Sequence, residues 1–224
     1  MNKNIVVISA DHEDEVLGAG GALLRHKEQS DNLYWIIVTQ MFEEQGYDTK
    51  KIKKRDEENE KVASALGCQK VFILKYKTME LSSISLIKMI PEIGEIFKEI
   101  KPETVYCVNS SDAHSDHRIT FDAVAASTKS FRHPYVKNFL MYECISETEF
   151  YPRLHESSFT PNYYIDITKH IDQKIELIKI YSSEISEHPF PRSVDNIKAL
   201  ATFRGAIAGV QYAEAFQIVK IIDK

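Results

Sequence analysis

Cysteine is scarce in this sequence: Cys68, Cys107 and Cys144 are the three among 224 residues. They are widely spaced and form no Cys-x-x-Cys pair, which excludes a disulfide framework and a cysteine-rich metal clip. Cys68 and Cys107 adjoin or lie in apolar runs, so buried structural roles are expected for them. This cysteine usage predicts a cytoplasmic location, where thiols stay reduced.

Long apolar runs and an excess of positive charge are also absent. No segment approaches the roughly 20 apolar residues that a membrane span requires, and the apolar stretch near the N-terminus is too short for a signal peptide. The formal net charge is −5 at pH 7, so the chain lacks the electrostatic footprint of a protein that binds nucleic acid or an anionic membrane.

Short β-branched apolar runs alternate with amphipathic segments of helical period along most of the chain. This alternation predicts an α/β fold, Rossmann-like, with a mostly parallel central sheet covered by helices on both faces. No repeat or linker interrupts the pattern, so we expect a single domain over residues 1–224. The expected strands are 4–9, 32–39, 70–74, 103–108, 137–143 and 161–168, and the expected helices are 16–29, 51–67, 84–100 with an interruption at Pro91, 119–128, 169–185 and 194–208.

A dense acidic turn, Asp11-His12-Glu13-Asp14-Glu15, follows the first expected strand. Ligands of open α/β sheets bind at the carboxyl ends of the strands, which is where this turn lies. Repulsion among its carboxylates costs free energy unless a cation or a reaction uses them. A dinucleotide site is disfavoured, because carboxylates stand where a phosphate-binding turn needs glycine. Gly18, Gly20 and Gly21 come a turn later and are expected to allow close packing of helix against sheet.

A second polar cluster, "NSSDAHSDHR" over residues 109–118, follows the fourth expected strand. His114 and His117 are three residues apart in it, and Asp112 and Asp116 lie beside them. Taken alone, such a turn is typical of a helix cap rich in Asp and Ser. Two clusters at the same edge of a parallel sheet can converge on one ion, however, and carboxylate and imidazole are ligands of zinc and similar metals. The two clusters together therefore predict a metal site.

The segments Ala10-Asp11-His12-Glu13-Asp14-Glu15 and Asp112-Ala113-His114-Ser115-Asp116-His117 resemble the two motifs of the PIG-L/LmbE-like family of metal-dependent N-acetylglucosamine-type deacetylases. The family motifs read Ala/Pro-His-Pro-Asp-Asp-Glu and Asp-x-His-x-Asp-His. Weaker similarities follow in the same order as in the family. They are "RDEENEKVASALG" (55–67), "HPFPRS" (188–193), "RGAIAG" (204–209) and "YAEAF" (212–216).

The resemblance implies that Asp11, Asp14 and His117 bind one divalent metal ion. Asp11 stands where the family has histidine. The added negative charge lowers the Lewis acidity of the ion and shifts the preference of the site from zinc towards manganese, iron(II) or magnesium. His12 is an alternative ligand, with Asp11 as its hydrogen-bonding partner. Zinc is the metal expected from the resemblance, and manganese and iron(II) are the alternatives.

The resemblance also implies the catalytic residues. Glu13 falls on the position of the general base, where the family has aspartate, so its carboxylate reaches one methylene further. His114 falls on the histidine that stabilises the oxyanion, and Asp116 on the residue that orients this histidine. No substrate-binding residue is identified by these motifs.

The implied activity is a metal-dependent hydrolase that removes the N-acetyl group from an N-acetylated amino sugar by means of a metal-activated water. The alternative is a catalytically impaired or non-catalytic sugar-binding relative on the same fold, because Asp11 replaces the ligand histidine. The expected partner is a small-molecule amino sugar, and neither nucleic acid nor a membrane is expected. The sequence leaves a homo-oligomer open.

Overall fold

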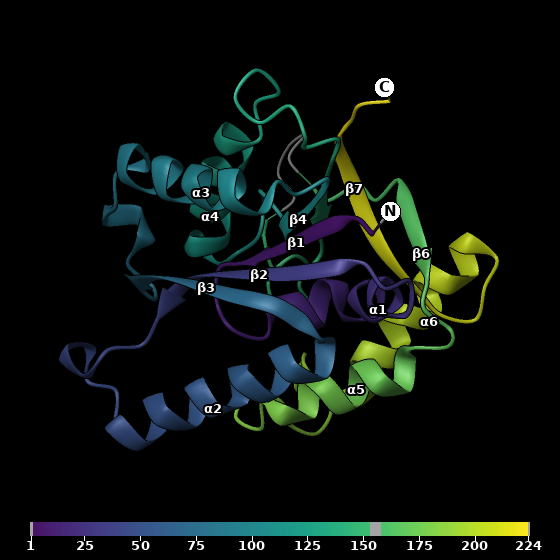
Figure 1. The fold of residues 1–224 in the computed structure, drawn as a ribbon. Coiled ribbons are helices and arrows are strands. Elements are labelled where there is room, and N and C mark those ends of the chain that lie inside the picture. The colour runs from purple at the N-terminus through teal and green to yellow at the C-terminus, as the bar shows by residue number, and fades with distance from the viewer. Residues whose placement is uncertain (1, 153–157, 224) are drawn as a thin grey trace.

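The computed structural model describes residues 2–152 and 158–223. Within these residues it contains one seven-stranded sheet in the order β3-β2-β1-β4-β5-β7-β6 (Figure 1). The strands are β1 (Asn4–Ser9), β2 (Asn32–Gln40), β3 (Cys68–Lys77), β4 (Thr104–Val108), β5 (Asn138–Tyr142), β6 (Tyr163–Asp166) and β7 (Ala213–Ile221). The helices are α1 (Asp14–Glu28), α2 (Thr49–Leu66), α3 (Leu86–Ile100), α4 (Ser115–Ser127), α5 (Ile171–Ile180) and α6 (Val194–Ala208), with short 3₁₀ turns η1 (Glu43–Gln45) and η2 (Leu81–Ser83).

The first five strands are parallel to one another, which confirms the expected α/β class. The two remaining strands form the antiparallel end of the sheet, where β7 pairs with both β5 and β6. The sequence did not predict β7. A buried charge, Glu214, stands within its buried half and hides the apolar pattern.

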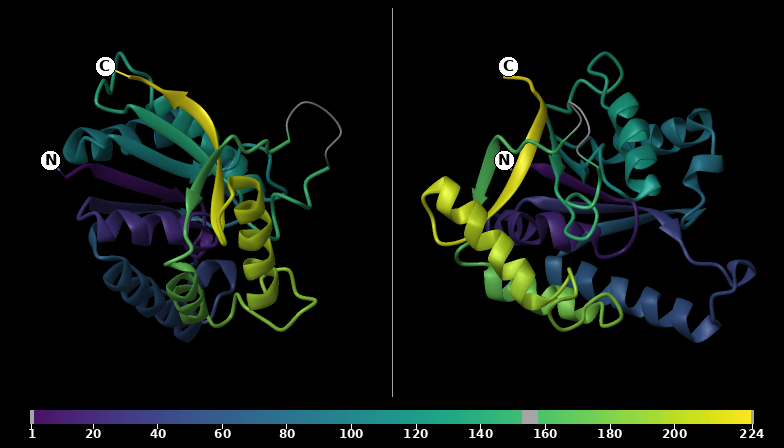
Figure 2. Two further views of the ribbon diagram at one scale, coloured as in Figure 1. Left: turned by 90° about the vertical axis from the view of Figure 1, so that its right-hand side faces the viewer. Right: turned by 180° about the vertical axis from the view of Figure 1, so that it is seen from behind.

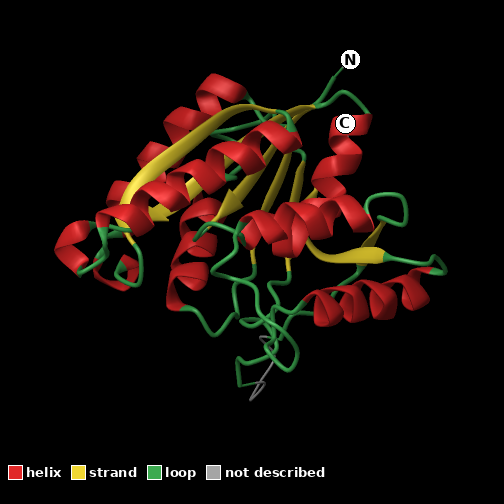
Figure 3. Cartoon of the chain, turned by 90° about the horizontal axis from the view of Figure 1, so that it is seen from below, coloured by secondary structure: helices red, strands yellow, loops and turns green. Residues whose placement is uncertain are grey.

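Helices cover both faces of the sheet, as expected (Figure 3). α3 and α4 pack together on one face, and α1, α2 and α5 lie on the other (Figure 1). α6 packs against β6 and β7 near the antiparallel end (Figure 2). β1 and β4 are parallel neighbours in the middle of the sheet, so the loops that follow them start side by side at its carboxyl edge. None of the described helices combines the length and the apolar character needed to cross a membrane.

Two glycines of α1 allow the close packing that the sequence predicts. A Cβ atom added to Gly18 would lie 2.0 Å from Tyr142 Cδ2, and one added to Gly21 would lie 2.5 Å from Ile167 Cγ2. Both distances are far below van der Waals contact. The glycines that follow the acidic turn therefore let α1 approach β5 and the segment after β6.

The expected interruption of α3 at Pro91 is wrong, because the helix runs through this proline. Proline removes the hydrogen bond to the carbonyl four residues earlier, which belongs to Ile87. Ile87 is 84% exposed, so water can satisfy that carbonyl. α5 is shorter than the expected helix 169–185, since it ends at Ile180.

Candidate active site

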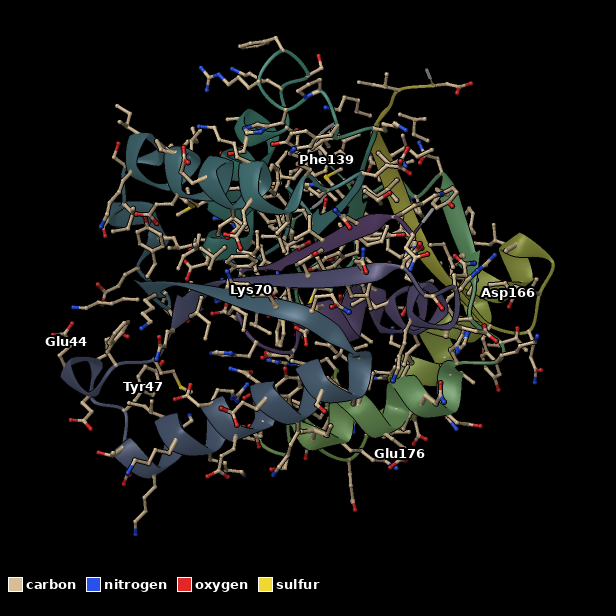
Figure 4. The ribbon with its side chains drawn as sticks, viewed as in Figure 1. Glu44, Tyr47, Lys70, Phe139, Asp166 and Glu176 are labelled. Atoms are coloured by element: carbon tan, nitrogen blue, oxygen red, sulfur yellow. The ribbon has the colours of Figure 1, made fainter. Side chains whose placement is uncertain are left out.

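Both polar clusters reach the same cavity at the carboxyl edge of the sheet. Its volume is about 200 Å³, and Asp11, Glu13, Asp14, His114 and His117 all line it. The loop between β2 and α2 closes one side through Tyr47, and this loop projects beyond the edge of the sheet (Figure 4). The convergence of the two clusters is the arrangement that the sequence predicts.

His117 lies at the centre of the site and is almost fully buried. Its Nε2 atom is 3.3 Å from Asp14 Oδ1, and its Nδ1 atom is 2.8 Å from Asp112 Oδ2. Burial opposes a charge on this ring, but the carboxylates of Asp14 and Asp112 raise the pKa of His117 well above its usual value. A histidine held by a carboxylate at Nδ1 presents Nε2 to a metal, which is a common arrangement at metal sites.

Asp112 is itself fixed from the other side. Its Oδ1 atom accepts hydrogen bonds from Asn109 Nδ2 at 2.8 Å and from the Thr148 hydroxyl at 2.6 Å. The Asp112 side chain is completely buried. Every donor around this carboxylate thus holds it in the position that orients His117.

Two overlapping groups of side chains have the spacing of a metal site. Asp11, His114 and His117 form one group, and Asp14, His117 and Cys144 form the other. Within each group the candidate ligand atoms lie within 4.8 Å of one another. The expected trio of Asp11, Asp14 and His117 does not form such a group among the described residues, because Asp11 and Asp14 lie in different groups.

His12, the alternative ligand, belongs to neither group in the described part of the chain. Its Nδ1 atom lies 2.8 Å from Asn59 Nδ2, on α2, and 3.1 Å from Asn59 Oδ1. Burial lowers the pKa of His12 to about 4, and Arg55 adds to this effect, so the ring is neutral at pH 7.

Glu13 is held in an unusual position at the start of α1. Its φ of 71° lies in the left-handed region, which is rare outside glycine and costs roughly 1–3 kcal/mol. Glu13 Oε1 is 2.7 Å from Arg192 Nη1, and Oε2 is 3.2 Å from Arg55 Nη1. Burial raises the pKa of Glu13, and Asp14 and Glu184 add to the rise, whereas Arg192 and Arg55 oppose it. A carboxylate with a raised pKa is a better proton acceptor near neutral pH.

Asp116 contacts the His114 ring through its backbone. The Asp116 carboxylate accepts hydrogen bonds from the backbone N–H groups of Met79 at 2.6 Å and Leu81 at 3.2 Å. The backbone N–H of Asp116 instead donates to His114 Nδ1 at 3.2 Å. Because Nδ1 accepts, the neutral ring carries its proton on Nε2, which faces Asp11 Oδ2 at 3.7 Å.

Several residues of the site were missed by sequence reasoning. Arg55 was visible within the "RDEENEKVASALG" segment, but its contact with Glu13 depends on tertiary structure. Cys144 follows β5 directly, at the same sheet edge as both motifs, and this position was the signal that could have found it. Glu184 binds both Arg55 and Arg192 and had no local signal.

The geometry agrees with a family match. The family described as PIG-L, GlcNAc-PI de-N-acetylase, matches residues 6–128, which is more than half of the chain and includes both motifs. The chain therefore belongs to the PIG-L family.

The individual relatives are distant but match over most of their length. Diacetylchitobiose deacetylase of Thermococcus kodakarensis is 22% identical over 231 aligned residues, which cover 97% of this chain and 83% of the relative. The structure of N,N'-diacetylchitobiose deacetylase from Pyrococcus horikoshii superposes with a TM-score of 0.77 at 22% identity, over 97% of this chain and 84% of that one. These likenesses confirm the fold.

A third similar structure belongs to an enzyme with another reaction. GalB, the 4-carboxy-2-hydroxymuconate hydratase from Pseudomonas putida KT2440, superposes with a TM-score of 0.76 at 18% identity, over 99% of this chain and 98% of that one. The same fold thus carries both deacetylation and hydration, so the reaction of this chain has to be argued from its own site.

Proposed function

We propose that this protein is a metal-dependent N-deacetylase that hydrolyses the N-acetyl group of an amino sugar. The observation that carries the proposal is the arrangement of Asp112, His117 and Asp14, which points one imidazole nitrogen and one carboxylate oxygen into a cavity beside Glu13. Membership of the PIG-L family and the likeness to diacetylchitobiose deacetylases support it.

The donor set fits a divalent ion. Asp14 Oδ1 and His117 Nε2 are 3.3 Å apart. The Asp112 carboxylate accepts the Nδ1 proton, so Nε2 is the nitrogen that would bind a metal once its own proton has left to solvent. We propose Asp14 and His117 as two ligands. The third comes from a residue beside His117: Asp11, which the resemblance implies, or Cys144.

The side chains around this site can perform the proton transfers of amide hydrolysis. A divalent ion bound here supplies Lewis acidity for the acetyl carbonyl and acidifies a water. Glu13, with its raised pKa, accepts a proton from the attacking water and later delivers it to the leaving amine. Arg55 and Arg192 hold the Glu13 carboxylate in place during both transfers. His114, whose Nδ1 accepts from the backbone N–H of Asp116, would donate from Nε2–H to the oxygen that becomes negative during hydrolysis.

The proposed substrate is a small N-acetylated amino sugar, and diacetylchitobiose is the first compound to test. A cavity of about 200 Å³ accepts an acetamido group and part of one sugar ring more readily than a large conjugate. Lys51 and Tyr47, from α2 and the loop before it, line the cavity and are candidates for contact with sugar hydroxyls. The cytoplasmic location expected from the cysteine usage fits such a substrate.

Acetate release tests the proposal. The protein is loaded in turn with zinc, manganese and iron(II) and incubated with N-acetylglucosamine and N,N'-diacetylchitobiose. We expect acetate and free amine with at least one metal, loss of activity in His117→Ala, and full activity in His188→Ala, which changes an exposed histidine. If no metal supports acetate release while the sugar still binds, the protein is a sugar-binding relative and the proposal is wrong.

A further inference from the structure

One candidate ligand follows each of three adjacent strands: Asp14 begins α1, His117 lies in the first turn of α4, and Cys144 lies in the segment after β5. β1, β4 and β5 are neighbours in the sheet and run parallel. Asp14 follows β1, His117 follows β4, and Cys144 follows β5 by two residues. Because the carboxyl ends of parallel strands meet at one edge, this topology alone brings the three side chains together.

The distances in this group are those of ligands that share an ion. Asp14 Oδ1 is 3.3 Å from His117 Nε2 and 3.3 Å from Cys144 Sγ. Tetrahedral zinc with metal–ligand bonds of about 2.0–2.3 Å separates its ligand atoms by about 3.3–3.6 Å. Cys144 is only 1% exposed, so its thiol faces this group and not solvent.

One hydrogen-bond network positions both His117 and Cys144. Asp112 binds the His117 ring through Oδ2 and the Thr148 hydroxyl through Oδ1. The same Thr148 oxygen accepts a hydrogen bond of 2.8 Å from the backbone N–H of Cys144. Asp112 and Thr148 therefore support two members of the group at once, which is how partners of metal ligands are usually arranged.

Asp11, the competing ligand, is turned towards the other side of the site. Its Oδ1 atom accepts hydrogen bonds from the hydroxyls of Thr39, in β2, and Thr78, just after β3. Its Oδ2 atom lies 3.7 Å from His114 Nε2. The two hydroxyls already satisfy Oδ1 of the carboxylate that stands where the family has histidine.

We propose that Cys144 is the third protein ligand of the metal, so that the ion is held by Asp14, His117 and the Cys144 thiolate while Asp11 stays hydrogen-bonded to Thr39 and Thr78. The inference rests on the metal site of the proposed function and names a ligand that the family motifs do not contain. On binding, the metal–sulfur bond replaces the S–H bond, and the thiol proton leaves to solvent. A thiolate is a soft ligand, so the site prefers zinc to manganese or magnesium, which is opposite to the shift expected from Asp11.

Cobalt(II) spectroscopy of the full chain tests the inference without any substrate. Co²⁺ replaces zinc at such sites, and a cobalt–thiolate bond gives an intense charge-transfer absorption in the near ultraviolet, whereas oxygen and nitrogen ligands do not. We expect this band in the wild-type protein, its loss in Cys144→Ser and Cys144→Ala, and its retention in the control Cys68→Ser, a half-buried thiol in β3. Zinc affinity of Cys144→Ser should fall at least as far as on loss of a supporting hydrogen bond, roughly 10–100-fold.

Asp11→Asn distinguishes between Asp11 and Cys144 as the third ligand, and this test does not require a cysteine variant that folds. We expect this variant to keep the charge-transfer band and to bind cobalt within about threefold of wild type. The inference is overturned if wild-type protein binds one cobalt without the band, or if the band survives in Cys144→Ser. If the protein shows the band but releases no acetate, Cys144 is a metal ligand and the proposed deacetylase activity is wrong. If the protein releases acetate but shows no band, the activity is supported and Cys144 is not a ligand.

Discussion

Asp112→Asn is the substitution that probes the orientation of His117 most sharply. Oδ1 of Asp112 receives two donors, Asn109 Nδ2 and the Thr148 hydroxyl, so an acceptor must remain at that position. The amide oxygen of the variant therefore stays there, and its NH₂ group takes the place of Oδ2 beside His117 Nδ1, 2.8 Å away. An amide N–H that donates to Nδ1 forces the ring proton onto Nε2 and removes the lone pair that binds the metal.

Loss of the hydrogen-bonding partner of a metal ligand typically lowers the affinity for the metal by about 10–100-fold. This corresponds to about 1.4–2.7 kcal/mol of binding free energy. Competition for zinc with a chromophoric chelator measures the affinity, and circular dichroism checks the fold. Asp122→Asn is the control, because this aspartate is exposed on α4, the helix that carries His117, whereas Asp112 lies in the loop before it. A folded Asp112→Asn protein with zinc affinity within about threefold of wild type would refute the reasoning.

Three further predictions follow from other parts of the structure. Glu13→Gln removes the proton acceptor, so kcat for acetate release should fall by about 10²–10⁴ with metal content unchanged; an unaltered kcat would exclude Glu13 as the base. Lys174→Ala leaves Glu214 buried without its partner at 2.6 Å and should lower the free energy of unfolding, measured in urea, by about 3–5 kcal/mol. Little change is expected in Lys198→Ala, whose partly exposed side chain pairs with the exposed Asp172. A loss below about 1 kcal/mol in Lys174→Ala would contradict a structural role for its pair with Glu214. Burial lowers the pKa of His26, so the unfolded chain binds this proton more readily, and wild type should lose stability relative to His26→Gln as pH falls through about 6.5 towards the lowered pKa. If the free energy of unfolding changes equally in the two proteins between pH 7.5 and 5.5, the pKa of His26 is not lowered in the folded protein.

The parallel half of the fold could be predicted because its strands are short, apolar and β-branched. β1 and β4 are buried along almost their whole length, so their composition alone separates them from the amphipathic helices. β7 could not be predicted in the same way. Glu214 is buried there by Lys174 of α5 and by the backbone N–H groups of Gly21 and Ala22, and the sequence does not show these contacts.

The same distinction between local sequence patterns and tertiary contacts applies to the residues of the site. The two motifs place Asp14 and His117 at one sheet edge, and the strand order then brings them together without further information. The contacts of Glu13 with Arg55 and Arg192 join segments 42 and 179 residues apart in sequence. Such contacts leave no local pattern, so the sequence indicated Glu13 but neither of its arginine partners.

Anomalous diffraction from crystals of the zinc-loaded protein, measured on both sides of the zinc absorption edge, tests the central claim most directly. The account predicts one strong peak in the cavity, bonded to His117 Nε2 and Asp14 Oδ1 at about 2.0–2.2 Å. Two results would contradict this account. One is a single zinc ion per protein bound at another place, and the other is no zinc peak between these two atoms at saturating zinc.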